Sequence, residues 1–100
     1  MFQLETISPR MLDYYVHRPG VCIIDLREPE SYKEGHISGA INLPYREDRC
    51  ILPPREPLVI LYCDRGNVSL LCGRELAKRG YTVRSVVGGI HGYKGQNLVI

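Results

Sequence analysis

The chain has 100 residues, and its 13 Lys and Arg against 11 Asp and Glu leave a formal charge of +2. Hydrophobic residues make up 44% of the chain and charged residues 24%, a globular composition that argues against disorder. This length predicts one domain over residues 1–100, because a second core of ordinary size would not fit. So small a charge gives no reason to expect a nucleic-acid or membrane-surface partner.

Two features of the sequence predict a cytosolic protein. The longest strictly apolar run, residues 58–61, is far shorter than the roughly 20 residues of a membrane span. Residues 1–6 contain neither a basic segment nor an apolar stretch of signal-peptide length. In that compartment the cysteines are expected to stay reduced, and their spacing and that of the histidines predict no zinc site. They are Cys22, Cys50, Cys63 and Cys72.

The first half of the chain predicts two helices and two strands. A helix is expected from Ser8-Pro9 to about residue 19, with Ser8 as a capping residue and Pro9 at the first helical position. Residues 21–26 form a nearly unbroken apolar run, which is typical of a strand covered on both faces. A short polar helix over residues 29–34 and a short strand over residues 41–43 follow. Residues 46–57, rich in proline and charge, predict a surface loop.

The second half predicts the centre of the sheet. Residues 58–62 are apolar and β-branched, so we place this strand centrally. An amphipathic helix over residues 67–79 follows, then a strand over residues 82–87 and a short helix over residues 90–94. Such alternation predicts a three-layer α/β/α fold with a parallel sheet. Ligands of such sheets bind beyond the carboxyl ends of the strands.

The loop at the end of the predicted central strand has the features of a nucleophile site. Cys63 stands at the strand end, and the amides and partial positive charge of the next helix favour a thiolate there. Gly66 permits the curvature of an anion-binding loop, and Arg65 adds a cation. Asp64 opposes these effects if it faces the sulfur. The loop comprises Asp64, Arg65, Gly66, Asn67, Val68 and Ser69.

Each cysteine also has a purely structural interpretation. Unpaired cysteine is among the most buried residue types, and this is the preferred interpretation for Cys22 in a strand and Cys72 on the inner helix face. Cys50 is expected to be an exposed loop thiol. At Cys63 the glycine-containing turn and the following helix favour chemistry instead. Cys63 is therefore the predicted nucleophile.

Three segments resemble signatures of the rhodanese-like domain family. Residues 25–32 and 35–44 are similar to its first signature, residues 63–69 to its active-site loop, and residues 88–90 followed by Tyr93 to its closing motif. The resemblance spans nearly the whole chain in the family's order. It implies a five-stranded parallel sheet of order 3-2-4-5-1, with residues 2–5 as the first strand.

The resemblance also implies a chemistry, sulfurtransfer. The Cys63 thiolate would take the outer sulfur of thiosulfate or of a low-molecular-weight or protein persulfide, with residues 64–69 binding the substrate. The Cys63 persulfide would pass its sulfur to cyanide, a thiol or a protein partner. No metal or organic cofactor is implied.

Asp64 and Val68 depart from the family pattern, which often has arginine at both positions. Losing two cations predicts that thiosulfate is a poor donor and that a less anionic persulfide is a better one. It also leaves open a catalytically idle rhodanese-like module that binds a partner or senses oxidants. Phosphatase or arsenate reductase activity of the related fold is a weaker alternative. The related phosphatases have a loop one residue longer that ends in a phosphate-gripping arginine, whereas this chain has Val68 and then Ser69 there.

Other polar residues are expected to support the fold rather than react. Asp25 and Arg27 share a strand face and are interpreted as a structural pair near the loop. The resemblance to the family places His36 in a structural corner. Arg74 and Arg84 are placed either at the mouth of the site or in solvent, and Tyr45 and Tyr93 are candidates for the pocket rim.

Overall fold

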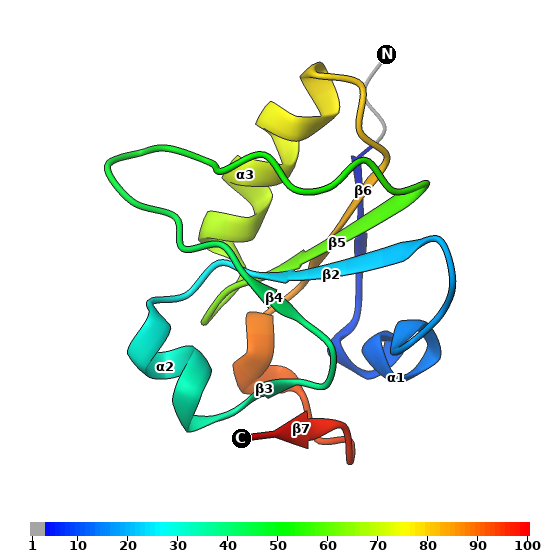
Figure 1. Ribbon diagram of the computed structural model, residues 1–100, viewed down its shortest axis with the longest axis vertical. Coiled ribbons are helices and arrows are strands. Elements are labelled where there is room, and N and C mark those ends of the chain that lie inside the picture. The colour runs from blue at the N-terminus through cyan, green and yellow to red at the C-terminus, as the bar shows by residue number, and fades with distance from the viewer. Residues whose placement is uncertain (1–3) are drawn as a thin grey trace.

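Five parallel strands form the central sheet of the computed structural model, which describes residues 4–100 (Figure 1). From one edge to the other they are β1 (Leu4–Ile7), β6 (Val83–Val86), β5 (Leu58–Tyr62), β2 (Val21–Asp25) and β4 (Ile41–Asn42). This is the predicted order read from the opposite edge. The most apolar strand, β5, lies in the middle of the sheet because both of its faces are covered.

Alternate residues of the inner strands point into two separate cores. On one face Val59 and Leu61 of β5 pack with Cys72 and Leu76 of the long helix α3 (Asn67–Lys78). On the other face Ile60 and Tyr62 form a second cluster. Leu12 of α1 (Leu12–Tyr15) lies in that cluster, and Tyr32 of α2 (Pro29–Glu34) packs against it. The predicted arrangement of helices on both faces is confirmed.

The first helix is shorter than predicted. It comprises a 3₁₀ turn, η1 (Pro9–Met11), and one α-helical turn, α1, and the Ser8 side chain makes no capping hydrogen bond. Val16 is already extended, and His17 has a left-handed φ of 59°, so the chain leaves the helix before the predicted end at residue 19. Near the C-terminus, η2 (Gly89–Gly92) is likewise a 3₁₀ turn, not the helix predicted over residues 90–94.

Two strand predictions need correction. The first strand is Leu4–Ile7 and not residues 2–5, of which residues 2 and 3 lie outside the described part of the chain. A second, antiparallel sheet of β3 (His36–Ile37) and β7 (Leu98–Val99) was not predicted. Strands of two residues have no detectable periodicity, and this pairing depends on the return of the C-terminal segment.

The structure contradicts the expectation that all cysteines are reduced. Cys50 and Cys72 form a disulfide across 22 positions of sequence, with their Cα atoms 5.6 Å apart, while Cys22 and Cys63 are free. The loop of residues 43–57 passes beside α3, which brings Cys50 to the helix (Figure 1). Across residues 4–100, none of the helices has the length and apolar character of a membrane span.

Candidate active site

Cys63 lies directly after the carboxyl end of β5, and its sulfur faces backbone donors. The Cys63 Sγ accepts hydrogen bonds from the amides of Gly66 at 3.1 Å and Ser69 at 3.4 Å. Gly66 adopts a φ of 101°, a conformation that glycine reaches without steric cost and that curls the loop around the sulfur. Both amide donors therefore point at the sulfur from the side of α3, and such donors stabilise an anion placed there.

Two buried serines hold this loop in its curled shape. The Ser69 hydroxyl donates to the Gly66 carbonyl at 3.1 Å and shares a 2.8 Å hydrogen bond with the Ser85 hydroxyl of β6. Both serines are buried among apolar side chains, where a hydroxyl needs a partner. Ser85 was not predicted from the sequence, because no pattern within β6 connects it with residue 69. The one sequence feature that pointed to Ser85 was its polar side chain between the apolar residues of the strand.

The turn η2 holds the Cys63 loop through backbone hydrogen bonds. The Ile90 amide donates to the Cys63 carbonyl at 2.9 Å, and the His91 amide donates to the Asp64 carbonyl at 3.4 Å. A Cβ on Gly89 would overlap both of those carbonyl groups, so this position requires glycine for close backbone contact. Gly89 therefore positions the Cys63 loop from 26 residues away in sequence.

A pocket of about 330 Å³ opens beside Cys63. Tyr45 lines it, as the sequence suggested, whereas Tyr93 does not: its hydroxyl donates to the Asp13 carboxylate of α1. Leu26 and Glu28 also line the pocket and were not predicted, because their contribution depends on the packing of β2 beside β5. The full lining is Leu26, Arg27, Glu28, Tyr45, Cys63, Asp64, Arg65, Asn67 and Val68.

The pocket carries charges of both signs, and most of them are paired. Arg27 is bound by Asp25 at 2.8 Å, and Glu28 by Arg46 at 3.0 Å. The Asp64 carboxylate lies 3.7 Å from His91 and is largely exposed, so it points past the sulfur toward η2. Of the pocket's cations, Arg65 is exposed and has no ion pair among residues 4–100.

Asp25 and Arg27 anchor the strand end next to Cys63. The Asp25 carboxylate is fully buried and accepts from the Arg27 side chain, the Arg27 amide and the Tyr62 hydroxyl. Burial and the neighbouring Asp25 raise the pKa of Tyr62 above its ordinary range, so its hydroxyl stays a donor. His36 stacks on Tyr32 and bonds its carbonyl at 2.8 Å, in the corner where β3 begins.

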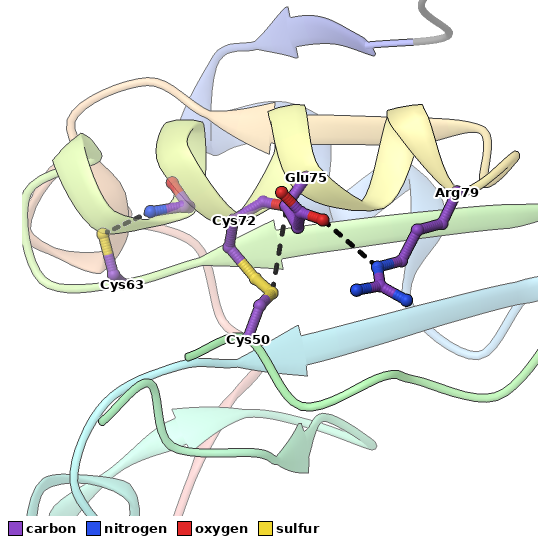
Figure 2. Close-up of a disulfide and its surroundings, with 6 residues drawn as sticks. Cys50, Cys63, Cys72, Glu75 and Arg79 are labelled. Carbon is purple, nitrogen blue, oxygen red and sulfur yellow. Dashed lines mark hydrogen bonds and ion pairs between the residues drawn. A yellow bond between two sulfur atoms is a disulfide. The ribbon is translucent and has the colours of Figure 1, made fainter. Parts of the chain in front are cut away.

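Three further candidates lie away from the pocket. Arg84 pairs with Glu5 at 3.3 Å, and Arg74 is exposed on α3. Cys22 is buried within β2, and this burial raises the pKa of its thiol. Figure 2 shows Cys63 by the first turn of α3 and the Cys50–Cys72 disulfide farther along the same helix.

Comparison with known proteins agrees with this fold. Residues 8–96 match the model of the rhodanese-like domain. The chain is 31% identical over 101 residues to thiosulfate sulfurtransferase GlpE of Tolumonas auensis, covering 94% of this chain and 92% of that one. It is 40% identical over 72 residues to a tRNA sulfurtransferase of Desulfurococcus amylolyticus, which covers 72% of this chain but 14% of that longer protein.

A solved structure shows the same architecture. The rhodanese-like domain protein of Staphylococcus aureus superimposes with a TM-score of 0.78 at 23% identity, covering 96% of this chain and 97% of that one. The family match spans most of the chain, including the loop of Cys63 and the glycines that brace it. The chain therefore belongs to the rhodanese-like domain family.

Proposed function

We propose that this chain is a sulfurtransferase that carries a sulfane sulfur on Cys63. The observation that supports this most directly is the pair of amide hydrogen bonds, from Gly66 and Ser69, to the Cys63 Sγ. Relatives named thiosulfate sulfurtransferase and tRNA sulfurtransferase support the activity class. Residues 64–69 form the substrate loop in this proposal, and the Asp25–Arg27 pair supports the strand end beside it.

The reaction has two balanced half-steps. The Cys63 thiolate attacks the outer sulfur of the donor, a sulfur–sulfur bond forms, and the donor leaves as sulfite (from thiosulfate) or as a thiolate (from an organic persulfide). A nucleophile such as cyanide or a thiolate then attacks the outer sulfur of the Cys63 persulfide and regenerates the Cys63 thiolate. The attacking species is the thiolate, so the attack itself requires no general base.

The charges of the pocket support an organic persulfide over thiosulfate as the better donor. Thiosulfate is a small dianion, but Arg27 is already bound by Asp25 and Glu28 by Arg46, and Asp64 adds negative charge to the pocket. Arg65 is the remaining cation of the lining. A peptide persulfide such as glutathione persulfide carries both ammonium and carboxylate groups, which the mixed lining suits better.

Intact-protein mass spectrometry tests the proposal. The chain is incubated separately with thiosulfate and glutathione persulfide, freed of excess donor and weighed before and after cyanide. A gain of one sulfur atom that cyanide removes is expected, and Cys63→Ser should show none. Cys22→Ser is the matched control, because it removes the other free thiol and should keep the gain.

The idle binding module remains as the outcome that would replace this proposal. A folded chain that gains no sulfur from either donor would contradict sulfurtransfer through Cys63. A faster first half-step with thiosulfate than with glutathione persulfide would contradict the donor preference alone. A cytoplasmic location belongs to the same proposal, and fractionation of cells expressing the tagged full-length protein would test it.

A further inference from the structure

The disulfide joins two segments that otherwise lack a shared secondary structure. Cys50 lies in the long loop between β4 and β5, and Cys72 lies on the inner face of α3. Cys72 is buried, whereas Cys50 is partly exposed and packs against the core cluster that contains both Cys63 and Cys72. One covalent bond thus fastens this loop to the helix that begins at the Cys63 loop (Figure 2).

The turn next to Cys50 has a strained backbone. Arg46 and Arg49 pair as an isolated bridge, closed by the Arg49 amide donating to the Arg46 carbonyl at 2.8 Å. Between them Glu47 and Asp48 have left-handed φ values of 52° and 57°, which residues other than glycine rarely adopt. Such a conformation persists when its surroundings hold it in place. The bond from Cys50 to Cys72 is one of these restraints.

Tyr45 connects this turn to the Cys63 pocket. Its amide donates to the carbonyl of Leu26, the residue after β2, at 3.0 Å, and this bond fixes the start of the turn there. Its side chain lines the Cys63 pocket and also a second, polar pocket of about 470 Å³ that contains Cys50 and Cys72. A single side chain therefore forms part of both the pocket beside the nucleophile and the pocket beside the disulfide.

From these contacts we infer that Cys50 and Cys72 form a reversible redox pair, and that its oxidation state sets the order of Tyr45 in the Cys63 pocket. In the oxidised form both ends of the 46–49 turn are fastened and the pocket wall is preformed. In the reduced form the end at Cys50 is released, the turn relaxes, and Tyr45 loses its fixed place. The effect on the Cys63 reaction rests on the proposed sulfurtransferase function.

The redox step takes a low-molecular-weight disulfide as oxidant, here glutathione disulfide. The Cys50 thiolate attacks one of its sulfurs, breaks its S–S bond, forms a mixed disulfide and releases one glutathione thiolate. The Cys72 thiolate then attacks the Cys50 sulfur, breaks the mixed disulfide, forms the Cys50–Cys72 bond and releases the second glutathione thiolate. The two glutathione thiolates take up the two protons that the cysteines lost on ionisation, so two electrons and two protons pass to the oxidant, and glutathione reverses the sequence.

The second pocket gives such a reagent access to the pair. Besides the two cysteines it is lined by both acidic and basic side chains, as suits a peptide that carries both charges. They are Asp48, Arg49, Glu75 and Arg79, of which Glu75 and Arg79 are ion-paired at 3.2 Å. Cys50, the partly exposed member, is the sulfur that such a reagent reaches first.

Thiol counting tests the redox pair without any sulfur transfer. The Cys63→Ser variant keeps three of the four cysteines. After equilibration with glutathione and unfolding, we expect three thiols in the reduced form and one, that of Cys22, in glutathione disulfide. Adding Cys50→Ser should leave the count at two under both conditions. Three thiols in Cys63→Ser at every ratio of glutathione to its disulfide would overturn the pair.

Hydrogen exchange tests the release of the turn in the same Cys63→Ser protein. Amides of residues 45–50 should exchange faster in the reduced form, while those of β5 should exchange at the same rate in both forms. Equal exchange of residues 45–50 in the two forms would overturn the link between the disulfide and the pocket wall. This readout does not depend on catalysis.

Kinetics test the consequence for the pocket. Oxidised wild type is identified by its two remaining thiols, and Cys50→Ser represents the released turn. We expect Cys50→Ser to raise KM for glutathione persulfide about two- to tenfold with little change in kcat, because the donor must order Tyr45 on binding. Cys72→Ala should match it, and Cys22→Ala should not raise KM. An unchanged KM would overturn the coupling between the disulfide and the Cys63 pocket. A chain that is inert toward every donor would instead contradict the proposed function, and hydrogen exchange would then decide the coupling.

Discussion

The Tyr62 hydroxyl donates a hydrogen bond to the buried carboxylate of Asp25, with Oη and Oδ2 2.7 Å apart. This contact ties the end of β5 to the end of β2, one residue before the nucleophile proposed at Cys63. The same hydroxyl accepts from the Ile37 amide at 3.0 Å, so it also holds β3 against the sheet. The strand end that carries Cys63 is therefore fixed by a polar network inside an apolar core.

Replacing Tyr62 with phenylalanine should destabilise the fold and leave its shape intact. The change leaves the buried Ile37 amide without its acceptor and removes one donor from Asp25, at a cost of about 1–3 kcal/mol. Urea unfolding measures the loss. Tyr32→Phe is the matched control, because its hydroxyl binds one carbonyl, that of Ala40, and is only half-buried. An equal or smaller loss in Tyr62→Phe would contradict the importance of this network.

Replacing Gly89 with alanine should displace the Cys63 loop. The new Cβ would overlap the carbonyls of Cys63 and Asp64, and φ at this position is 64°. The loop must then shift, which moves the amides of Gly66 and Ser69 away from the sulfur. We expect a loss of persulfide formation per folded molecule, measured by mass spectrometry on protein whose folding is verified by circular dichroism.

The neighbouring glycine provides the control for this prediction. Gly88 also has a left-handed φ, 75°, but a Cβ there meets nothing within 4 Å. Gly88→Ala therefore has a similar backbone cost without the overlap, and it should lower stability while keeping persulfide formation. Equal activity of the two variants would show that close contact behind the loop is not required.

The disulfide should contribute substantially to stability when it is formed. Closing a loop of 22 residues restricts the unfolded chain and is worth about 3 kcal/mol in the chain-entropy model. Chemical unfolding of Cys63→Ser in its oxidised and reduced forms measures this directly. Adding Cys50→Ser should remove the difference. A free energy of unfolding that is the same in both forms would contradict the prediction.

The hydrogen bonds of Asp13 predict an acid-dependent loss of stability. The Asp13 carboxylate accepts from the Tyr93 hydroxyl and, at 2.8 Å, from the Asn97 side chain, and these bonds lower its pKa in the folded state, Tyr93 contributing most. Because the folded pKa lies below the unfolded value of about 3.9, the stabilisation is present above that value and is lost as pH falls through the folded pKa.

Comparing wild type with Asp13→Asn between neutral and acid pH measures this effect. The difference in their free energies of unfolding should be largest at neutral pH and shrink toward zero on acidification. Glu30→Gln, an exposed carboxylate on α2, is the control and should show a smaller dependence. A gap that stays constant with pH would contradict an ionised Asp13 as the acceptor.

Removing the Asp64 charge should favour the anionic donor. The carboxylate lines the Cys63 pocket and is exposed, so Asp64→Asn should raise kcat/KM for thiosulfate about two- to fivefold. The gain for glutathione persulfide should be smaller, and high salt should reduce both. Glu30→Gln, outside the pocket, should change neither rate. A decrease for thiosulfate would indicate that Asp64 helps to bind the donor.

Local signals were sufficient to predict much of this protein. The apolar run of β5 identifies the centre of the sheet, and α3 is predicted by its amphipathic spacing and by Gly80 after it. The position of Cys63 between them follows from the order of the elements. Such features depend on the conformational preferences of residues that are close in sequence, and the sequence shows these directly.

Contacts between distant residues were decided by the tertiary structure. The disulfide joins Cys50 to Cys72 of α3, 22 positions away, and Ser85 contacts the Cys63 loop through its hydrogen bond to Ser69. The early end of α1 likewise reflects its surroundings, where the His17 imidazole bonds the Ser38 hydroxyl 21 positions on. No short-range pattern encodes such a partner, because the partner is chosen by how the packed layers bring separate segments together. The sequence thus determined the order of the elements and the candidate nucleophile, and packing determined what surrounds that nucleophile.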